Sequence, residues 1–186
     1  MKIPKFICNT ENLINWPLVI DRINASGGYP NCLVGPEEDT KDDDHPQGSY
    51  WDTLITAGYN WSEVTWTDFE VDIIDPELVI IFSKLVGAKS LRCFISKVDP
   101  GKCVAMHWDE GDVRYHNPQT KDNMYRYICF IKPSEIGQTL IVGDHCFHNA
   151  KYGDVFEWHH YTDFHATYNA SLTPHYIFHF LGYKEK

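Results

Sequence analysis

From Ser90 to the C-terminus the chain alternates short apolar segments with turn residues, and no helical segment separates them. Asp99-Pro100-Gly101 is the clearest of these turns. Strands joined by short turns pair antiparallel, whereas a parallel sheet needs crossover helices. The segments with the length and composition of strands are 91–98, 102–108, 124–132, 139–142, 154–158, 164–169 and 175–182. This half of the chain therefore predicts an antiparallel sandwich or barrel, an all-β jelly roll.

Two helices are predicted before these strands. Asp75 is a good N-cap, Pro76 suits the first helical position, and Gly87 ends a helix over 78–86. That segment is apolar on nearly all sides, so we expect it to pack against the sheet. Thr10 is the expected cap of an earlier helix that continues to Asn24.

The length of 186 residues suits a single domain, 1–186. We expect a helical and loop-rich N-terminal cap over 1–89 and a β-barrel core with the functional site over 90–186. The segment 29–66 is rich in Tyr and Trp among Gly, Pro and polar residues. It could form a lid, a substrate wall or an irregular cap on the barrel.

Charge and cysteine usage limit the function classes. The net charge of −10 disfavours binding to nucleic acid or to an anionic membrane surface. No apolar stretch approaches the ~20 residues of a membrane span, and the N-terminus lacks a secretory signal. The six cysteines form no CxxC pair, so we expect reduced thiols in the cytoplasm rather than a zinc ribbon or a disulfide framework.

The sequence His107-Trp108-Asp109 is the strongest chemical motif. Residues i and i+2 of a strand project to the same face, so the imidazole and the carboxylate can converge on one metal. One distant histidine would complete a 2-His-1-carboxylate triad, which binds Fe(II) and leaves positions open. The candidates for that histidine are His145, His148, His159, His160, His165 and His179. His165 opens a strand after a polar turn, whereas His145 and His148 flank an expected loop.

Residues 96–107 and His165-Ala166-Thr167-Tyr168-Asn169 resemble the two iron-histidine segments of a known family. This family is the aspartyl/asparaginyl β-hydroxylase branch of the Fe(II)/2-oxoglutarate-dependent oxygenases, and the resemblance covers 91–183. It implies a mainly β, double-stranded β-helix fold (jelly roll, cupin-like) with the N-terminal helices packed on the sheet. It also implies that His107 and His165 hold Fe(II). The branch often has Gly at the position of Asp109, whereas this chain keeps Asp109, as in the commoner triad of the wider superfamily.

The resemblance further implies residues for binding 2-oxoglutarate. Ser96 matches a serine that touches this co-substrate, and Arg126 matches an arginine on the strand after the first ligand. His175 stands ten residues after His165, where the family has the arginine that grips the distal carboxylate. Either His175 replaces that arginine, or Arg126 supplies the charge alone, or the co-substrate binds weakly. Arg92 and Arg114 are further cations that could serve.

The sequence thus favours an Fe(II)- and 2-oxoglutarate-dependent dioxygenase that consumes O2. It would be a hydroxylase of an aspartyl, asparaginyl or other amino-acid residue, or of a small molecule. Two alternatives stay open. One is a metal-dependent β-barrel (cupin) enzyme without 2-oxoglutarate, favoured by His175 in place of arginine. The other is a non-catalytic jelly-roll binding module whose aromatic residues stack on sugars.

Overall fold

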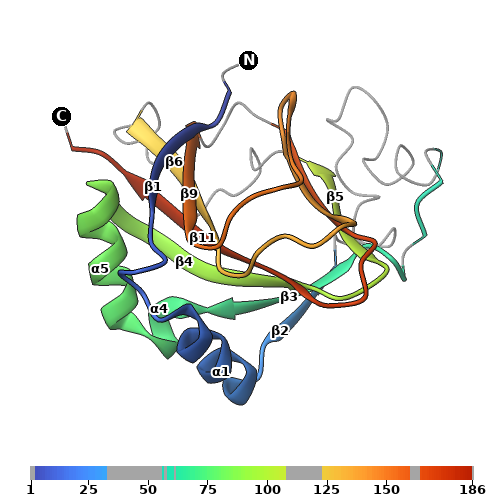
Figure 1. Ribbon diagram of the computed structural model, residues 1–186, viewed down its shortest axis with the longest axis horizontal. Coiled ribbons are helices and arrows are strands. Elements are labelled where there is room, and N and C mark those ends of the chain that lie inside the picture. The colour runs from blue at the N-terminus through green and yellow to red at the C-terminus, as the bar shows by residue number, and fades with distance from the viewer. Residues whose placement is uncertain are drawn as a thin grey trace, which may run out of the picture.

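The computed structural model describes residues 3–32, 56, 58–60, 62–107, 123–159 and 164–185. The described strands form two antiparallel sheets (Figure 1). The larger sheet has the order β1-β9-β6-β11-β4-β3-β2, and the smaller has the order β5-β10-β7-β8. The strands are β1 (Lys5–Asn9), β2 (Tyr29–Cys32), β3 (Thr65–Glu70), β4 (Lys89–Val98), β5 (Lys102–His107), β6 (Met124–Phe130), β7 (Gln138–Val142), β8 (His145–Phe147), β9 (Asp154–His159), β10 (His165–Asn169) and β11 (His175–Tyr183).

From β4 onward the chain passes back and forth between the two sheets. The strands β4, β6, β9 and β11 lie in the larger sheet, and β5, β7, β8 and β10 lie in the smaller. This alternation is the topology of a double-stranded β-helix, so the predicted fold class is confirmed. Each of the seven predicted strand segments overlaps a strand of the structure.

Four strands were not expected. The segments β1, β2 and β3 come from the N-terminal part and extend the larger sheet at both edges. The strand β8 covers His145–Phe147, where we expected a loop, and pairs with β7. That prediction was wrong because three residues are too few to show the alternation of a strand, and pairing with β7 determines their conformation.

The first helix begins later than predicted. The helix α1 covers Trp16–Ser26, and its N-cap is Asn15, whose side chain accepts a hydrogen bond from the backbone N–H of Leu18. Thr10 is not the cap, because its hydroxyl donates to the carbonyl of Gly153 and accepts from Trp16 Nε1, both at 2.9 Å. It therefore fixes the chain before α1 against the turn that leads into β9.

The second predicted helix agrees with its capping residues. The short helix α4 (Val71–Ile74) precedes α5 (Pro76–Val86), and the Asp75 carboxylate accepts from the N–H of Leu78. Gly87 ends α5 at φ 65°, the left-handed region that glycine adopts without strain. At 11 residues each, α1 and α5 are too short to cross a bilayer, and no described helix is long and apolar enough to do so.

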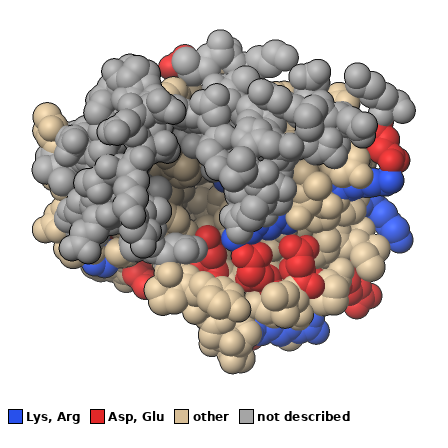
Figure 2. Space-filling model, turned by 180° about the vertical axis from the view of Figure 1, so that it is seen from behind, with Lys and Arg blue, Asp and Glu red and all other residues tan. Residues whose placement is uncertain are grey.

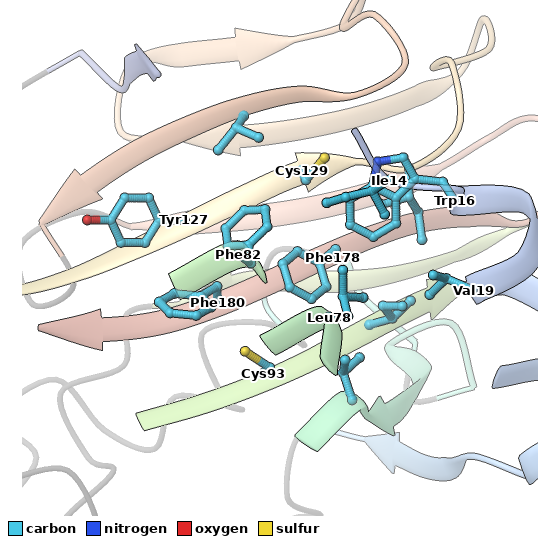
Figure 3. Close-up of a cluster of buried hydrophobic side chains, with 14 of the residues drawn as sticks. Ile14, Trp16, Val19, Leu78, Phe82, Cys93, Tyr127, Cys129, Phe178 and Phe180 are labelled. Atoms are coloured by element: carbon cyan, nitrogen blue, oxygen red, sulfur yellow. The ribbon is translucent and has the colours of Figure 1, made fainter. Parts of the chain in front are cut away.

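One face of the larger sheet packs against the helices (Figure 1). Figure 3 shows Phe82 of α5 beside Phe178 and Phe180 of β11, with ring centroids 4.7 and 5.3 Å away. Trp16 closes the same cluster from α1 and is fully buried. This core leaves the other face of the larger sheet to pack against the smaller sheet. Residues between the sheets include Ile128, Phe130, Leu140, Val142, Phe147, Trp158 and Ile177.

Candidate functional site

Two histidines meet at one end of the space between the sheets. His107 is the last residue of β5, His165 is the first of β10, and the two are partners in the register of the smaller sheet. Their ring centroids lie 4.3 Å apart, and His165 is only 4% exposed. Antiparallel pairing therefore brings together two imidazoles that are 58 positions apart in the sequence.

The hydrogen bonds of these histidines define which nitrogen carries the proton. His107 Nδ1 lies 2.8 Å from the carbonyl oxygen of Ala105, which can only accept, so Nδ1 is protonated and the neutral form of the ring has its lone pair on Nε2. Arg126 Nη1 lies 3.3 Å from His165 Nε2, and a guanidinium can only donate, so this Nε2 is also unprotonated. As neutral imidazoles, both rings thus have their lone pair on Nε2. The Ala105 carbonyl orients the His107 ring in the way that a hydrogen-bond acceptor on the far nitrogen orients a metal-binding histidine.

This donor set fits a divalent transition metal. Two neutral imidazoles suit iron, zinc or nickel. The third predicted ligand, Asp109, lies outside the described residues, as do Trp108, Arg114 and His160. Within the described ranges no group of three or more His, Cys, Asp or Glu side chains could hold a metal. The described part of the chain therefore brings together two of the three side chains of the predicted triad.

Arg126 is a buried cation in contact with this histidine pair. It lies on β6, opposite Trp158 of β9 and Leu181 of β11, and its side chain is 8% exposed. Besides the contact with His165, its guanidinium carbon is 6.0 Å from the ring centre of Phe94. A buried guanidinium needs acceptors around it, because an unpaired buried charge is costly. The contact with His165 supplies one such acceptor for the buried guanidinium.

Beside Arg126 lies a stack of side chains that the sequence does not predict. His179 of β11 stacks on Phe94 of β4, with ring centroids 4.6 Å apart and an angle of 8°. The guanidinium of Arg92 lies 4.4 Å from the same ring and pairs with Glu70 at 2.5 Å. Of the candidate third histidines, His179 therefore packs inside the barrel as part of an aromatic wall. Periodicity gives no signal for such a cross-strand stack.

The hydroxyl of Ser96 is hydrogen-bonded to a buried carboxylate, a partner that the sequence alone does not predict. Its hydroxyl donates to Asp68 Oδ1 of β3 at 2.6 Å, and Asp68 is 6% exposed. Burial raises the pKa of the Asp68 carboxyl, and the hydrogen bond from Ser96 partly opposes that rise. The Ser96 hydroxyl can thus accept a hydrogen bond from a ligand, but its proton is already donated to Asp68.

His175 lies toward the opposite end of the barrel. It opens β11 opposite Val98, whereas Arg126 pairs with Leu181, six residues further along the same strand, or about 20 Å at 3.3 Å per residue. Within the described ranges neither ring nitrogen of His175 has a hydrogen-bond partner, and the ring stacks near Phe130. Burial lowers its pKa to about 4, so the imidazole is neutral at neutral pH. The structure does not bring His175 and Arg126 together.

Two further candidate histidines, and one aromatic residue of the N-terminal segment, make contacts with other parts of the barrel. His145 packs against Phe147 within β8, and His159 ends β9 against Tyr125. Tyr59, from the aromatic-rich segment, packs with Val64, Cys103 and Tyr168. Its hydroxyl lies 2.8 Å from that of Tyr168, on the smaller sheet. This part of the segment covers the barrel rather than its two-histidine end.

One face of the molecule carries side chains of both charges (Figure 2). Figure 2 shows acidic side chains gathered across the middle of the face seen from behind, with basic side chains beside them. The acidic excess agrees with the net charge of −10. This face therefore carries charges of both signs among the residues that the structure describes.

Neither the known protein families nor the curated proteins include a match to this sequence. Solved structures do match. A protein of the 2OG-Fe(II) oxygenase family from Burkholderia pseudomallei is 12% identical with a TM-score of 0.51, covering 91% of this chain and 79% of the other. A prolyl-4-hydroxylase from Pseudomonas putida is 9% identical with a TM-score of 0.50, covering 91% and 99%. A predicted oxalate decarboxylase from Thermotoga maritima is 14% identical with a TM-score of 0.39, covering 64% and 81%.

The likenesses to the oxygenase-family protein and to the prolyl-4-hydroxylase establish the fold. The chain is a double-stranded β-helix protein with the architecture found in 2OG-Fe(II) oxygenases. At such low identity they show the fold alone, and the resemblance to the aspartyl/asparaginyl branch stays a prediction. The function has to be argued from the site itself.

Proposed function

We propose that this protein is an Fe(II)- and 2-oxoglutarate-dependent oxygenase, acting as a hydroxylase. The observation that carries the proposal is the meeting of His107 and His165 with both Nε2 atoms unprotonated. In the proposal these two nitrogens and the Asp109 carboxylate hold the iron. When bound together, Fe(II), 2-oxoglutarate and O2 supply the oxidising power that hydroxylates a C–H bond.

The chain's own residues prepare this chemistry in three ways. The Ala105 carbonyl holds His107 in the tautomer that exposes Nε2 to a metal. Arg126 supplies a buried positive charge for an anionic co-substrate, a role that neutral His175 does not share at neutral pH. Phe94 and Trp158 supply apolar walls that keep water away from the reacting groups.

The finer parts of the proposal concern substrate and compartment. The motif resemblance favours an aspartyl or asparaginyl side chain in a peptide, or a small molecule of similar chemistry, as substrate. We place the protein in the cytoplasm, where its thiols would stay reduced.

Metal and co-substrate binding test the function. We expect the protein to bind Mn(II), a redox-inert substitute for Fe(II), and then 2-oxoglutarate, as measured by calorimetry. His107→Ala and His165→Ala should each weaken metal binding by about a hundredfold or more, since each removes a direct ligand. His148→Ala is the matched control, because His148 is exposed in the segment after β8. With Fe(II) and ascorbate, the wild type should convert 2-oxoglutarate to succinate.

A wild type that binds neither Mn(II) nor 2-oxoglutarate would refute the proposal. A second candidate function is a metal-dependent enzyme of this fold that does not use 2-oxoglutarate. It is favoured by His175, which is uncharged and lies where the resembling family has an arginine. For that candidate, Mn(II) raises the melting temperature but 2-oxoglutarate gives no further rise.

A further inference from the structure

Trp158 carries a buried donor that the fold itself does not use. Its side chain is 4% exposed, and Nε1 has no hydrogen-bond partner in the described part of the structure. Its ring centroid lies 6.0 Å from that of His165. It is also the register partner of Arg126, which puts the two Cβ atoms about 5 Å apart on the same face of the larger sheet.

A second tryptophan shows what a buried indole normally requires. Trp16 is also buried, but its Nε1 donates to the Thr10 hydroxyl at 2.9 Å. Leaving such a donor unpaired costs free energy, and a phenylalanine at position 158 would fill much of the same apolar space without that cost. The unpaired N–H of Trp158 therefore points to an acceptor that comes from outside the chain.

The surroundings specify the chemistry of that acceptor. The guanidinium of Arg126 and the indole N–H of Trp158 offer one positive charge and a further donor at a largely buried place beside His165. A carboxylate carries one negative charge and two acceptor oxygens, which this pair can satisfy. A phosphate dianion would retain an uncompensated charge in a buried place.

We infer that Arg126 and Trp158 form a carboxylate-binding pair, with the indole N–H of Trp158 as the second donor to an anionic ligand beside His165. The inference rests on the proposed function for the identity of the ligand, 2-oxoglutarate. It extends that function by assigning a binding residue on β9.

Two matched substitutions test the inference with opposite effects. Trp158→Phe keeps an aromatic ring but removes the N–H, so it should weaken 2-oxoglutarate binding to the Mn(II)-loaded protein about tenfold or more. It should leave the melting temperature unchanged or raise it, because an unpaired buried donor is removed. Trp16→Phe removes a paired N–H far from the site, so it should lower the melting temperature and leave 2-oxoglutarate affinity unchanged.

A measurement on the wild type gives the same information without relying on a variant's folding. In a spectrum of ¹⁵N-labelled indoles, the Trp158 proton should move downfield when 2-oxoglutarate binds, and the Trp16 proton should not. Equal affinity of wild type and Trp158→Phe for 2-oxoglutarate, or an unmoved Trp158 indole signal, would overturn the inference while the proposed oxygenase stands.

The two hypotheses are separated by a second probe, pyruvate. If the protein binds pyruvate in a Trp158-dependent way but not 2-oxoglutarate, the carboxylate pair is supported and the proposed function fails. If it binds neither compound, both are overturned.

Discussion

Replacing Arg126 by methionine should strengthen metal binding, although Arg126 is not itself a ligand. In the structure Arg126 Nη1 donates to His165 Nε2, the nitrogen that a metal needs. Metal binding must break this hydrogen bond, and methionine makes no such bond while filling a similar apolar volume. A hydrogen bond from a charged donor contributes about 1.5–3 kcal/mol, and 3.3 Å is long for N–H···N contacts of this kind. We therefore expect about 1.5 kcal/mol, or about tenfold tighter Mn(II) binding.

The assay is calorimetric titration of the metal-free protein with Mn(II), in wild type, Arg126→Met and Arg92→Met. Arg92 pairs with Glu70 and lies over Phe94, so its removal is a control for a loss of positive charge near the site. Arg92→Met should change Mn(II) affinity less than Arg126→Met does. If Arg126 instead holds His165 in a metal-binding position, Arg126→Met will weaken Mn(II) binding. That result would refute the competition between guanidinium and metal.

Three further predictions test the surrounding structure. Asp75→Ala removes both the N-cap of α5 and a 2.6 Å ion pair with Arg22, so it should cost about 1–2 kcal/mol and lower Tm by about 4 °C, measured by calorimetry against Glu77→Ala. A thiol reagent should modify exposed Cys146 faster than buried Cys103, since burial raises the pKa of Cys103 to about 11. Cys146→Ser should therefore remove one fast-reacting thiol and leave the slow reaction of Cys103 unchanged. Burial depresses the pKa of His175 from 6.5 to about 4, so below pH 6.5 the unfolded chain takes up a proton that the folded protein does not. Between pH 6.5 and 4.5 this residue should cost about 2–3 kcal/mol of stability, and His175→Phe should flatten that loss in urea unfolding; an equally steep loss in the variant would contradict it.

The parts of the fold that were predictable are those in which local signals agree. Asp75, Pro76 and Gly87 each favour the same helix, and the structure places each in the expected capping role. Apart from the three-residue β8, the β-strands of the C-terminal half are long enough to show their apolar and aromatic content. The start of helix α1 was less predictable because Thr10 and Asn15 are both good N-cap residues. In the structure the Thr10 hydroxyl instead donates to the carbonyl of Gly153, and Asn15 is the cap.

The sequence predicts which candidate residues lie at the ends of strands. It does not predict which residues become neighbours on adjacent strands of a sheet. His165 was expected to open a strand, and the pairing of β10 with β5 puts it beside His107. By contrast, the neighbours of Arg126 are set by β9 and β11, whose order in the sheet does not follow the order of the chain. The role of Trp158 could not be inferred from its own segment, because an apolar strand residue gives no sign that its N–H is unpaired.

Strand β6 shows why the helix-side core and the candidate site depend on one another. Side chains alternate along a strand, so Tyr127 and Cys129 face the helices while Arg126 and Ile128 face the smaller sheet. A slip of one residue would place the guanidinium among the aromatic rings around Phe82, where a charge has no acceptor. The apolar packing against α5 therefore does more than stabilise the domain. It selects the one register of β6 that presents Arg126 to His165, so mutations in the helix-side core should affect the site through that register rather than through direct contact.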